Sequence, residues 1–391
     1  MKIGVFTDSY FPYTSGVVHS IDTFNQELVA LGHEVFIFAP SYPNIQDDQE
    51  NVFRFSSLPA PTNRDFTLAF PFSFHLENIL EKWQPEIIHA HSPFILGHVG
   101  SSCARRLRIP LVFTFHTLYD EYVHYFPIAR KITKNVVRSI SRNFCNRSNV
   151  VIVPTEVVRE HLRQMGVSTP IKKIPTGIKL SEFSNLDRFW LKKNYGIPER
   201  SKVLLFVGRL GQEKNIYFLL ECFEKVFAEL PGTFLVLVGS GPEEEELKNL
   251  TIDRGISNNI IFAGKKDRSE MARHYAGSDL FVFTSLTETQ GLVIAEAKAA
   301  GIPSVAVKAN GVCEMVDDGE DGYLTDLDQD SFIEKVVLLL KDDELRKRFS
   351  EKAKENVKKI SSRRCALELI DSYQEILQAE GVKKYLVNGD K

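Results

Sequence analysis

Short apolar runs alternate with amphipathic stretches along the first half of the chain. The apolar runs predict strands at residues 3–7, 34–39, 87–90, 111–115 and 150–153. Between them, apolar residues recur at helical spacing, which predicts helices at about 17–31, 72–82, 97–107, 128–145 and 157–165. Strands that alternate with helices build a parallel sheet covered on both faces, so this half predicts one α/β domain.

The second half repeats the plan. Its apolar runs predict strands at 203–207, 233–238, 260–263, 280–283 and 304–307. Helical spacing predicts helices at about 216–229, 243–253, 269–276, 291–300, 329–340 and 342–357. We therefore expect two Rossmann-like domains that face each other across a cleft, with ligands beyond the carboxyl ends of the strands.

The boundary between the domains is expected in the segment 174–183, where Pro175 and Gly177 suit a crossover. Residues 1–176 then form the N-terminal domain, and residues 177–364 form the C-terminal domain. A helical pattern near the end of the chain predicts a last helix at about 365–391 that packs back on the first domain.

Length and composition agree with two globular domains. The chain has 391 residues, and single domains rarely exceed roughly 250–300 residues. Its 48 Lys and Arg against 51 Asp and Glu give a formal charge of -3, which argues against a nucleic-acid partner. No apolar run approaches the roughly 18 residues that span a bilayer.

The cysteines and the N-terminus indicate a cytoplasmic protein. The five Cys are scattered without a CxxC pair, so neither a disulfide framework nor a zinc site is expected. The polar residues Thr7, Asp8 and Ser9 end the first apolar run at once, which argues against a signal peptide.

The loop after the first strand of the second half carries two cations. Gly208 suits a tight turn at the strand end, and Arg209 and Lys214 follow it before a helix begins. A guanidinium fork, an ammonium and a helix N-terminus together suit a bound anion. The alternative is a solvated turn with two ordinary surface cations.

The strongest local signal is a pair of carboxylates, Glu288 and Glu296, eight residues apart across the start of a helix. Carboxylates accept hydrogen bonds from sugar hydroxyls, and the amides from Gln290 to Val293 are donors for phosphate or hydroxyl oxygens. The alternative is a capping carboxylate followed by a solvated helix glutamate. No DxD-like pair argues for a bound cation.

Two features of the first half are weaker. Gly16, before the first helix, would let a backbone amide approach a pyrophosphate. His116 ends the strand expected at 111–115 and is a candidate ligand contact, although a lone histidine is more often structural.

Together and in this order, these motifs resemble the retaining GT-B glycosyltransferases of family GT4, which use nucleotide sugars. The similarity spans essentially the whole chain, and its most specific pieces are residues 288–296, 208–214 and 175–183. Three further stretches, 1–12, 15–20 and 115–122, look like the branch that glucosylates diacylglycerol.

The resemblance implies roles for the candidate residues. Arg209 and Lys214 would grip the donor diphosphate, assisted by the amide of Gly16, although many relatives carry a glycine pair there. His116 would contact the donor sugar near its 6-position or the reacting centre. The candidate catalytic residues are His116, Glu288, Arg209 and Lys214. The donor-binding set implied by the resemblance is Gly16, Arg209, Lys214, Gly264, Lys265, Glu288, Gln290, Gly291, Leu292 and Glu296.

Within that set, Glu296 would bind the ribose hydroxyls, while Glu288 and the amides from Gln290 to Leu292 would hold the sugar. The base would lie near Gly264 and Lys265. No metal or other cofactor is expected, because protein cations would meet the diphosphate charge. The sequence offers no nucleophile for double displacement, so front-face attack with retention is expected.

The segment 128–147 carries six basic residues and no acidic one. Its apolar residues share about half of the helix circumference, and basic residues occupy most of the rest. Such a helix can lie on an anionic membrane; the alternative is a core-packed helix with a basic polar face. The residues expected at the membrane are Arg130, Lys131, Lys134, Arg138 and Arg142.

We therefore expect a cytoplasmic enzyme, peripheral at the inner face of the membrane. It would move a hexose, with glucose from UDP-glucose favoured, to a lipid hydroxyl, with 1,2-diacylglycerol as the preferred acceptor. The alternatives are a soluble or polysaccharide acceptor and a non-catalytic nucleotide-sugar-binding protein. The oligomeric state is left open.

Overall fold

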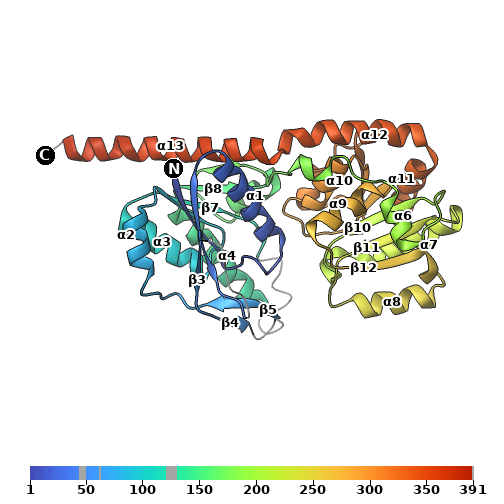
Figure 1. The fold of residues 1–391 in the computed structure, drawn as a ribbon, viewed down its shortest axis with the longest axis horizontal. Helices are drawn as coiled ribbons and strands as arrows, with labels where there is room; N and C mark the ends of the chain where they lie inside the picture. The colour runs from blue at the N-terminus through green and yellow to red at the C-terminus, as the bar shows by residue number, and fades with distance from the viewer. Residues whose placement is uncertain (44–49, 61–62, 120–129, 390–391) are drawn as a thin grey trace. The chain divides into compact units, whose positions relative to one another are not determined.

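A computed structural model of the chain describes residues 1–43, 50–60, 63–119 and 130–389 (Figure 1). The chain divides into two compact units. Unit 1 comprises Met1–Gly177 with Ser362–Lys391, and unit 2 comprises Ile178–Ser361. These limits lie within a few residues of the expected boundaries at 176 and 364.

Unit 1 is built on a seven-stranded sheet with the order β3-β2-β1-β6-β7-β8-β9. Every neighbouring pair in it is parallel. The strands are β1 (Lys2–Phe6), β2 (Glu34–Pro40), β3 (Val52–Phe55), β6 (Ile87–Ala90), β7 (Leu111–Thr114), β8 (Val150–Val153) and β9 (Ile171–Lys173). A separate antiparallel hairpin is formed by β4 (Ser57–Ala60) and β5 (Asn63–Ala69).

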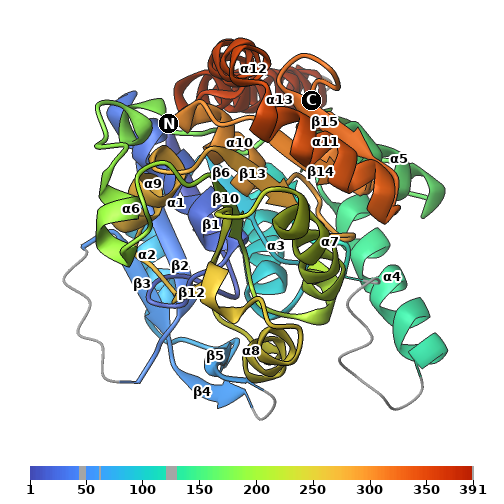
Figure 2. The same cartoon turned by 90° about the vertical axis from the view of Figure 1, so that its right-hand side faces the viewer.

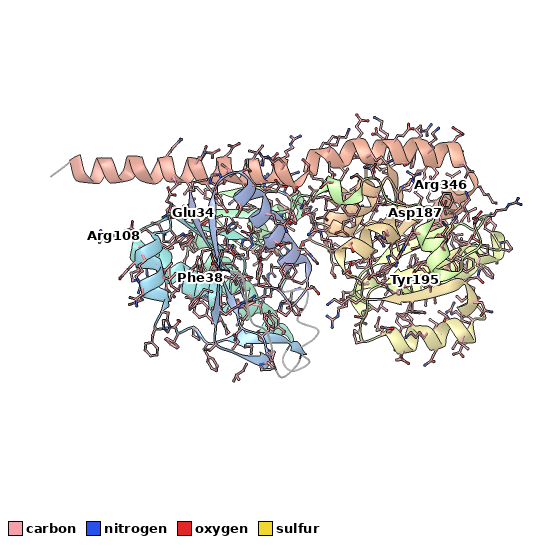
Figure 3. All side chains as sticks on the ribbon, in the orientation of Figure 1. Glu34, Phe38, Arg108, Asp187, Tyr195 and Arg346 are labelled. Carbon is pink, nitrogen blue, oxygen red and sulfur yellow. The ribbon has the colours of Figure 1, made fainter. Side chains whose placement is uncertain are left out.

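The helices of unit 1 follow the predicted order with shifted ends. They are α1 (Gly16–Ala30), α2 (Leu76–Trp83), α3 (Ile95–Leu107), α4 (Arg130–Arg147), α5 (Glu156–Gln164) and α13 (Ser362–Gly389). Ser15 caps α1 by accepting a hydrogen bond from the Val18 amide. In the core, the rings of Phe6 and Phe38 stack with centroids 4.4 Å apart (Phe38 is labelled in Figure 3).

The last helix, α13, belongs to unit 1 and packs on α1 (Figure 1). Its first residue, Ser362, donates to Glu27 of α1 at 2.5 Å. Further along, Leu369 and Tyr373 are buried. The apolar face of α13 therefore completes the core of unit 1.

Unit 2 contains a six-stranded parallel sheet with the order β12-β11-β10-β13-β14-β15. The strands are β10 (Val203–Val207), β11 (Phe234–Val238), β12 (Ile260–Gly264), β13 (Leu280–Phe283), β14 (Ser304–Val307) and β15 (Gly322–Thr325). The helices are α6 (Trp190–Tyr195), α7 (Ile216–Glu229), α8 (Glu244–Asp253), α9 (Arg268–Ala276), α10 (Leu292–Ala300), α11 (Gln329–Lys341) and α12 (Asp343–Asn356). Short 3-10 turns are η2 (Leu180–Phe183), η3 (Gln212–Lys214), η4 (Ser257–Asn259), η5 (Asn310–Glu314) and η6 (Val357–Ile360).

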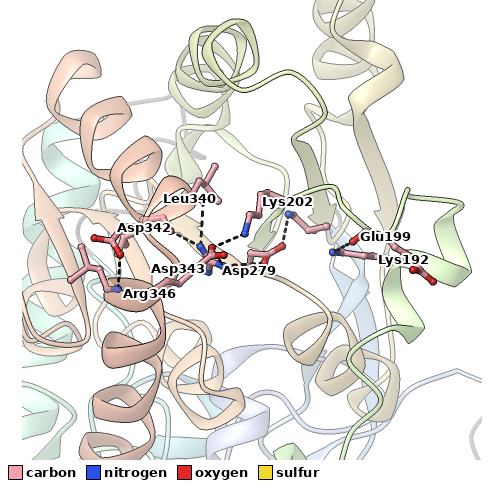
Figure 4. Close-up of polar contacts among 11 residues, drawn as sticks. Lys192, Glu199, Lys202, Asp279, Leu340, Asp342, Asp343 and Arg346 are labelled. Carbon is pink, nitrogen blue, oxygen red and sulfur yellow. Dashed lines mark hydrogen bonds and ion pairs between the residues drawn. The ribbon is translucent and has the colours of Figure 1, made fainter.

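A polar network ties α12 to the sheet of unit 2 (Figure 4). Arg346 of α12 pairs with Asp343 at 2.6 Å, and Asp343 also accepts from Lys202 at 2.9 Å. Asp279 accepts from the Val203 amide at 2.9 Å and lies 3.9 Å from Arg346. The network thus joins the start of α12 to the amino ends of β10 and β13.

Both sheets reverse their strand order once. In unit 2 the reversal lies between β10 and β13, and in unit 1 it lies between β1 and β6. Ligands of open parallel sheets bind beyond the carboxyl ends of the strands at such a switch point. Ligand-contacting residues are therefore expected in the loops after these strands.

Candidate active site

The loop after β10 is shaped by close backbone contacts with the loop after β11. The Leu210 amide donates to the Ser240 carbonyl at 3.0 Å, and the Leu210 carbonyl accepts from the Glu243 amide at 3.1 Å. A Cβ atom on Gly239 would lie 1.9 Å from the Gly208 carbonyl, and one on Gly241 would lie 2.1 Å from the Leu210 carbonyl. The steric demand for glycine therefore falls on the turn after β11.

This backbone arrangement places the two predicted cations differently. Arg209 is exposed, whereas Lys214 ends the turn η3 and is largely buried. The helix α7 begins two residues later, after Asn215 in the left-handed region at φ 52°. The Lys214 ammonium also lies 5.9 Å from the centre of the Phe283 ring.

Lys214 is paired with Glu288, the first carboxylate of the predicted motif. The ammonium and the carboxylate are in direct contact, and Ser285 donates to the same carboxylate at 2.9 Å. Only 14% and 19% of these two side chains are exposed. Because β10 and β13 are neighbours, the loops that follow them bring together residues 74 positions apart.

The charge of Glu288 follows from this contact. Burial raises the pKa of the Glu288 carboxyl, but the Lys214 ammonium and hydrogen bonds from Lys214 and Ser285 more than offset it. The net pKa lies below its ordinary value, so the carboxylate is ionised at neutral pH. A buried anion and cation therefore stand together at the switch point of unit 2.

The second carboxylate, Glu296, lies more than one turn inside α10. Tyr275 of α9 donates its hydroxyl to Glu296 at 2.8 Å. Burial raises the pKa of Glu296 to about 6, because it outweighs the hydrogen bond from Tyr275 and the charge of Arg268. Glu296 is thus a partly buried acceptor that titrates close to neutral pH.

The predicted amide donors surround the start of α10. Gly291, at φ 84°, is the cap, and Leu292 is the first helical residue. The first amides of a helix have no partners within the helix, so those of Leu292 and Val293 face the same end as the positive dipole. Gln290 is buried. These groups fit an anionic or hydroxyl-rich ligand.

The residues expected beside the base lie after β12. Gly264 ends this strand at φ 71°, and its carbonyl accepts from the Gly239 amide at 3.0 Å. Lys265 is exposed. Because β12 is next to β11 in the sheet, this loop lies beside the loop after β11. Glu288 follows β13, which is on the other side of β10.

In unit 1, Gly16 is exposed and begins α1. A Cβ atom there would meet nothing within 4 Å, so packing among the described residues does not require glycine. His116 follows β7 and is half-buried. Its Nε2 atom lies 2.8 Å from Nδ1 of His91. His91 was not among the residues predicted from the sequence.

His91 belongs to a buried cluster at the carboxyl ends of β6 and β7. His89 lies under it with ring centroids 4.2 Å apart, and Tyr373 of α13 contacts His89 Nδ1 at 2.6 Å. Beside it, Asp8 follows β1 and accepts hydrogen bonds from the Leu96 amide at 2.8 Å and from the Ser92 hydroxyl. These hydrogen bonds anchor the start of α3 to the loop after β1. The His-x-His spacing at a strand end was the available sequence signal.

The basic helix α4 is only partly as expected. Phe144 is fully buried against Phe113, with centroids 4.7 Å apart, which supports a core-packed face near the end of the helix. Val136, on the apolar half of the helix, is 50% exposed, so that half is not buried along its whole length. Lys134 and Arg138 are partly exposed and Arg142 is exposed. The side chains of Arg130 and Lys131 lie outside the described residues.

The described part of the chain contains neither a membrane-spanning helix nor a metal-binding cluster of side chains. There, no helix is both long and apolar enough to cross a bilayer. Over the same residues, no group of three or more His, Cys, Asp or Glu side chains is arranged to hold a metal ion.

The similarity of the chain to known protein families and to known proteins identifies its family. Residues 14–182 match the model for Glycosyltransferase Family 4, and residues 187–356 match that for glycosyl transferases group 1. An alpha-monoglucosyldiacylglycerol synthase of Streptococcus pneumoniae is 38% identical over 315 residues, which cover 78% of this chain and 71% of that protein. The chain belongs to glycosyltransferase family 4.

Two further similarities agree with this membership. An alpha-monoglucosyldiacylglycerol synthase of Acholeplasma laidlawii is 30% identical over 82% of this chain and 84% of its own length. The solved structure of Anabaena Alr3699/HepE in complex with UDP-glucose has a TM-score of 0.76 at 18% identity, covering 96% of this chain and 100% of that one. The prediction of a GT-B fold with two Rossmann-like domains is confirmed. The chain is a retaining GT4 hexosyltransferase.

Proposed function

We propose that this GT4 enzyme transfers glucose from UDP-glucose to the hydroxyl of a membrane lipid, with 1,2-diacylglycerol as the acceptor. The observation that carries the donor half is the buried Lys214–Glu288 pair at the switch point of unit 2. The acceptor half is supported by the two relatives named as alpha-monoglucosyldiacylglycerol synthases.

The geometry of unit 2 suggests how the donor is held. Lys214 and Arg209 would meet the diphosphate charge, which grows on the leaving group as the sugar–phosphate bond breaks. Glu288 would accept from sugar hydroxyls and Glu296 from the ribose, while the first amides of α10 donate. Because these protein cations meet the charge, we propose transfer without a bound metal.

Front-face attack accounts best for retention of the anomeric configuration. A double displacement needs a carboxylate about 5 Å from its partner across the anomeric carbon. Glu288 is held by Lys214 and Ser285, which suits an acceptor of hydroxyl hydrogen bonds better than a nucleophile. The leaving phosphate would then help to take the proton of the acceptor hydroxyl, and His116 would contact the donor sugar.

Exposed apolar side chains in unit 1 support a membrane partner. Leu58 and Leu68 are paired across the β4–β5 hairpin and are both exposed. The segment that follows exposes Phe70, and it exposes Phe72 and Phe74 by 85% and 98%. Apolar surface of this kind marks sites of interaction. Figure 2 shows the hairpin at the lower edge of unit 1, with α4 descending toward the same edge.

We therefore extend the proposed membrane surface from α4 to this hairpin. The basic residues Lys134, Arg138 and Arg142 would meet anionic headgroups, and the leucines and phenylalanines would enter the interface. The five cysteines, all within the described residues and all unpaired, support the cytoplasmic face.

The test is a panel of donors and acceptors. UDP-, GDP- and ADP-sugars are each offered with vesicles containing diacylglycerol and with soluble sugars, and the product and its anomeric configuration are determined by NMR. The proposal expects an α-glucosyl lipid from UDP-glucose, formed equally in EDTA. A product only on a soluble acceptor would favour the alternative acceptor class.

Membrane contact has its own test. The variant with Lys134, Arg138 and Arg142 replaced by Ser, and the variant with Phe72 and Phe74 replaced by Ser, should each sediment less with anionic vesicles. Hydrolysis of the donor in the absence of lipid should be spared, because neither variant changes a residue that is proposed to hold the donor. Equal loss of hydrolysis would indicate misfolding instead of lost membrane contact.

A further inference from the structure

The histidine cluster of unit 1 holds more polar groups than its surroundings require. His89, His91 and Tyr373 are almost completely buried, with exposures of 2%, 3% and 0%. A small cavity beside them is otherwise lined mainly by apolar side chains of β1, α1, β2 and α13. Buried polar side chains cost free energy unless they are hydrogen-bonded, so apolar residues would fill this space more cheaply.

Every ring in the cluster has a defined support. His89 is held at both nitrogens, by Tyr373 at 2.6 Å and by Thr114 at 2.7 Å. His91 lies against His89 with ring centroids 4.2 Å apart. His91 then contacts His116 through its Nδ1 atom at 2.8 Å, and their rings are nearly parallel at 20°. The chain of contacts runs from α13 to the one half-buried histidine of the cluster.

The protonation states give this arrangement a chemical consequence. Burial lowers the pKa of His89 and His116 to about 3, and it lowers that of His91 well below its ordinary value. At neutral pH each ring therefore carries a single N–H. In the contact between His91 and His116, one nitrogen holds the hydrogen and the other accepts it. The state of His91 thus decides whether Nδ1 of His116 is a donor or an acceptor.

We propose that His91 is a positioning residue for His116, supported from behind by His89 and by Tyr373 of the C-terminal helix. It holds the His116 ring in one orientation and one tautomer, so that Nδ1 is the nitrogen presented to the sugar. This proposal rests on the role proposed above for His116. It gives α13 a part in the reaction besides completing the core of unit 1.

Three substitutions at one position separate the hydrogen bond from the packing. His91→Ala removes both, and His91→Phe keeps a ring against His89 but loses the hydrogen bond. His91→Asn places an amide near the position of Nδ1 and can restore the contact with His116. Because a small misplacement of a reacting group can cost about 100-fold in rate, we expect kcat to fall about 10- to 100-fold in the Ala and Phe variants. The KM for the donor should change little, and Asn should recover most of kcat.

A double-mutant cycle tests whether His91 acts through His116. In the His116→Ala background, His91→Ala should cause no further loss of kcat, because the group that it positions is gone. Multiplying losses, or an Asn variant as slow as the Ala variant, would overturn the proposal.

The contribution of the C-terminal helix has a matched control. Tyr373→Phe removes one hydroxyl that contacts a histidine, and Tyr195→Phe does the same in unit 2, where Tyr195 lies 2.9 Å from Nε2 of His274 (Tyr195 is labelled in Figure 3). We expect Tyr373→Phe to lower kcat, by less than His91→Ala, and Tyr195→Phe to leave it unchanged. Equal effects of the two would contradict a positioning role.

A spectroscopic readout keeps this test apart from the test of the proposed function. In protein labelled with ¹⁵N-histidine, the ring nitrogens of His116 should report one tautomer in the wild type and a mixture in His91→Ala. An unchanged tautomer would overturn the positioning proposal even if the enzyme is active. If no donor and acceptor pair yields product, the proposed substrates fail, while the NMR result still decides the role of His91.

Discussion

Replacing Lys214 with Met removes the ammonium from the Lys214–Glu288 pair and keeps most of the side-chain volume. The change has two separable effects. It withdraws a cation from the place where we propose that leaving-group charge develops. It also leaves the Glu288 carboxylate largely buried, with Ser285 as its remaining hydrogen-bond donor among the described side chains.

The magnitude of each effect follows from burial. With only 14% and 19% of the two side chains exposed, breaking the pair belongs in the range for buried ion pairs, about 3 kcal/mol. For a domain the size of unit 2, that loss lowers the Tm by about 6–12 °C. Loss of one preorganised donor to developing charge lowers kcat by about 100- to 1000-fold.

The sign of the pH dependence follows from Glu288. Its pKa is depressed in the folded protein, so the pair stabilises above the ordinary carboxyl pKa and loses this contribution as the pH falls through the folded value. In Lys214→Met, the hydrogen bond from Ser285 is left to oppose burial, so the pKa of Glu288 is higher than in the wild type. The stability gap between wild type and variant should therefore be largest near pH 7 and should narrow as the pH falls below about 4.5.

The assay combines calorimetry across this pH range with steady-state kinetics of glucosyl transfer. The matched control is the double variant Lys214→Met with Glu288→Gln, which removes both charges. It should recover most of the Tm but none of kcat. A single variant with near wild-type kcat would refute the assignment of Lys214 to the diphosphate. A stability gap that stays constant from pH 7 to well below pH 4.5 would refute the pairing.

Three further outcomes are expected. Donor affinity should fall as the pH drops below about 6, because protonation turns one oxygen of Glu296 into a donor and weakens the acceptance of hydrogen bonds from the ribose. Glu296→Gln should remove this dependence in calorimetric titrations with UDP. A wild-type profile that is flat between pH 5 and pH 7 would contradict this role. Lys298→Met leaves Asp321, its partner at 2.6 Å, buried without a counter-charge. The free energy of unfolding of unit 2 in urea should fall by about 3–5 kcal/mol. A decrease below about 1 kcal/mol would contradict a stabilising ion pair. Gly241→Ala places a Cβ atom 2.1 Å from the Leu210 carbonyl, so the loop after β10 must shift and both Tm and UDP affinity should fall. The control is Gly232→Ala, at a surface turn where a Cβ atom meets nothing within 4 Å, and it should lower Tm alone.

The positions of the most deeply buried strands and helices could be predicted from the sequence alone. The runs at Val203–Val207 and Leu280–Phe283 are fully buried strands, and they are found where their apolar patterns place them. The helix Ile216–Glu229 has the predicted limits. Such segments have a long, unambiguous apolar pattern because every side chain, or one whole helix face, must leave water.

Short edge strands and the hairpin were not predicted. β9 has three residues, two of them lysines, and β15 is a four-residue strand that starts at Gly322. Strands of this kind pair on one side only and have little apolar pattern of their own. Their position is decided by the neighbouring strand, which periodicity along the chain does not reveal.

The candidate residues of unit 2 could be named from the sequence, but their relation could not. Lys214 and Glu288 were selected as two separate ligands, and only the pairing of β10 with β13 makes them an ion pair. The contact between His89 and Tyr373 spans 284 residues and depends on α13 folding back onto unit 1. Local pattern determines which face of an element is buried, whereas the partner of a buried polar group is set by strand order and chain return, because these bring distant loops to one edge of a sheet.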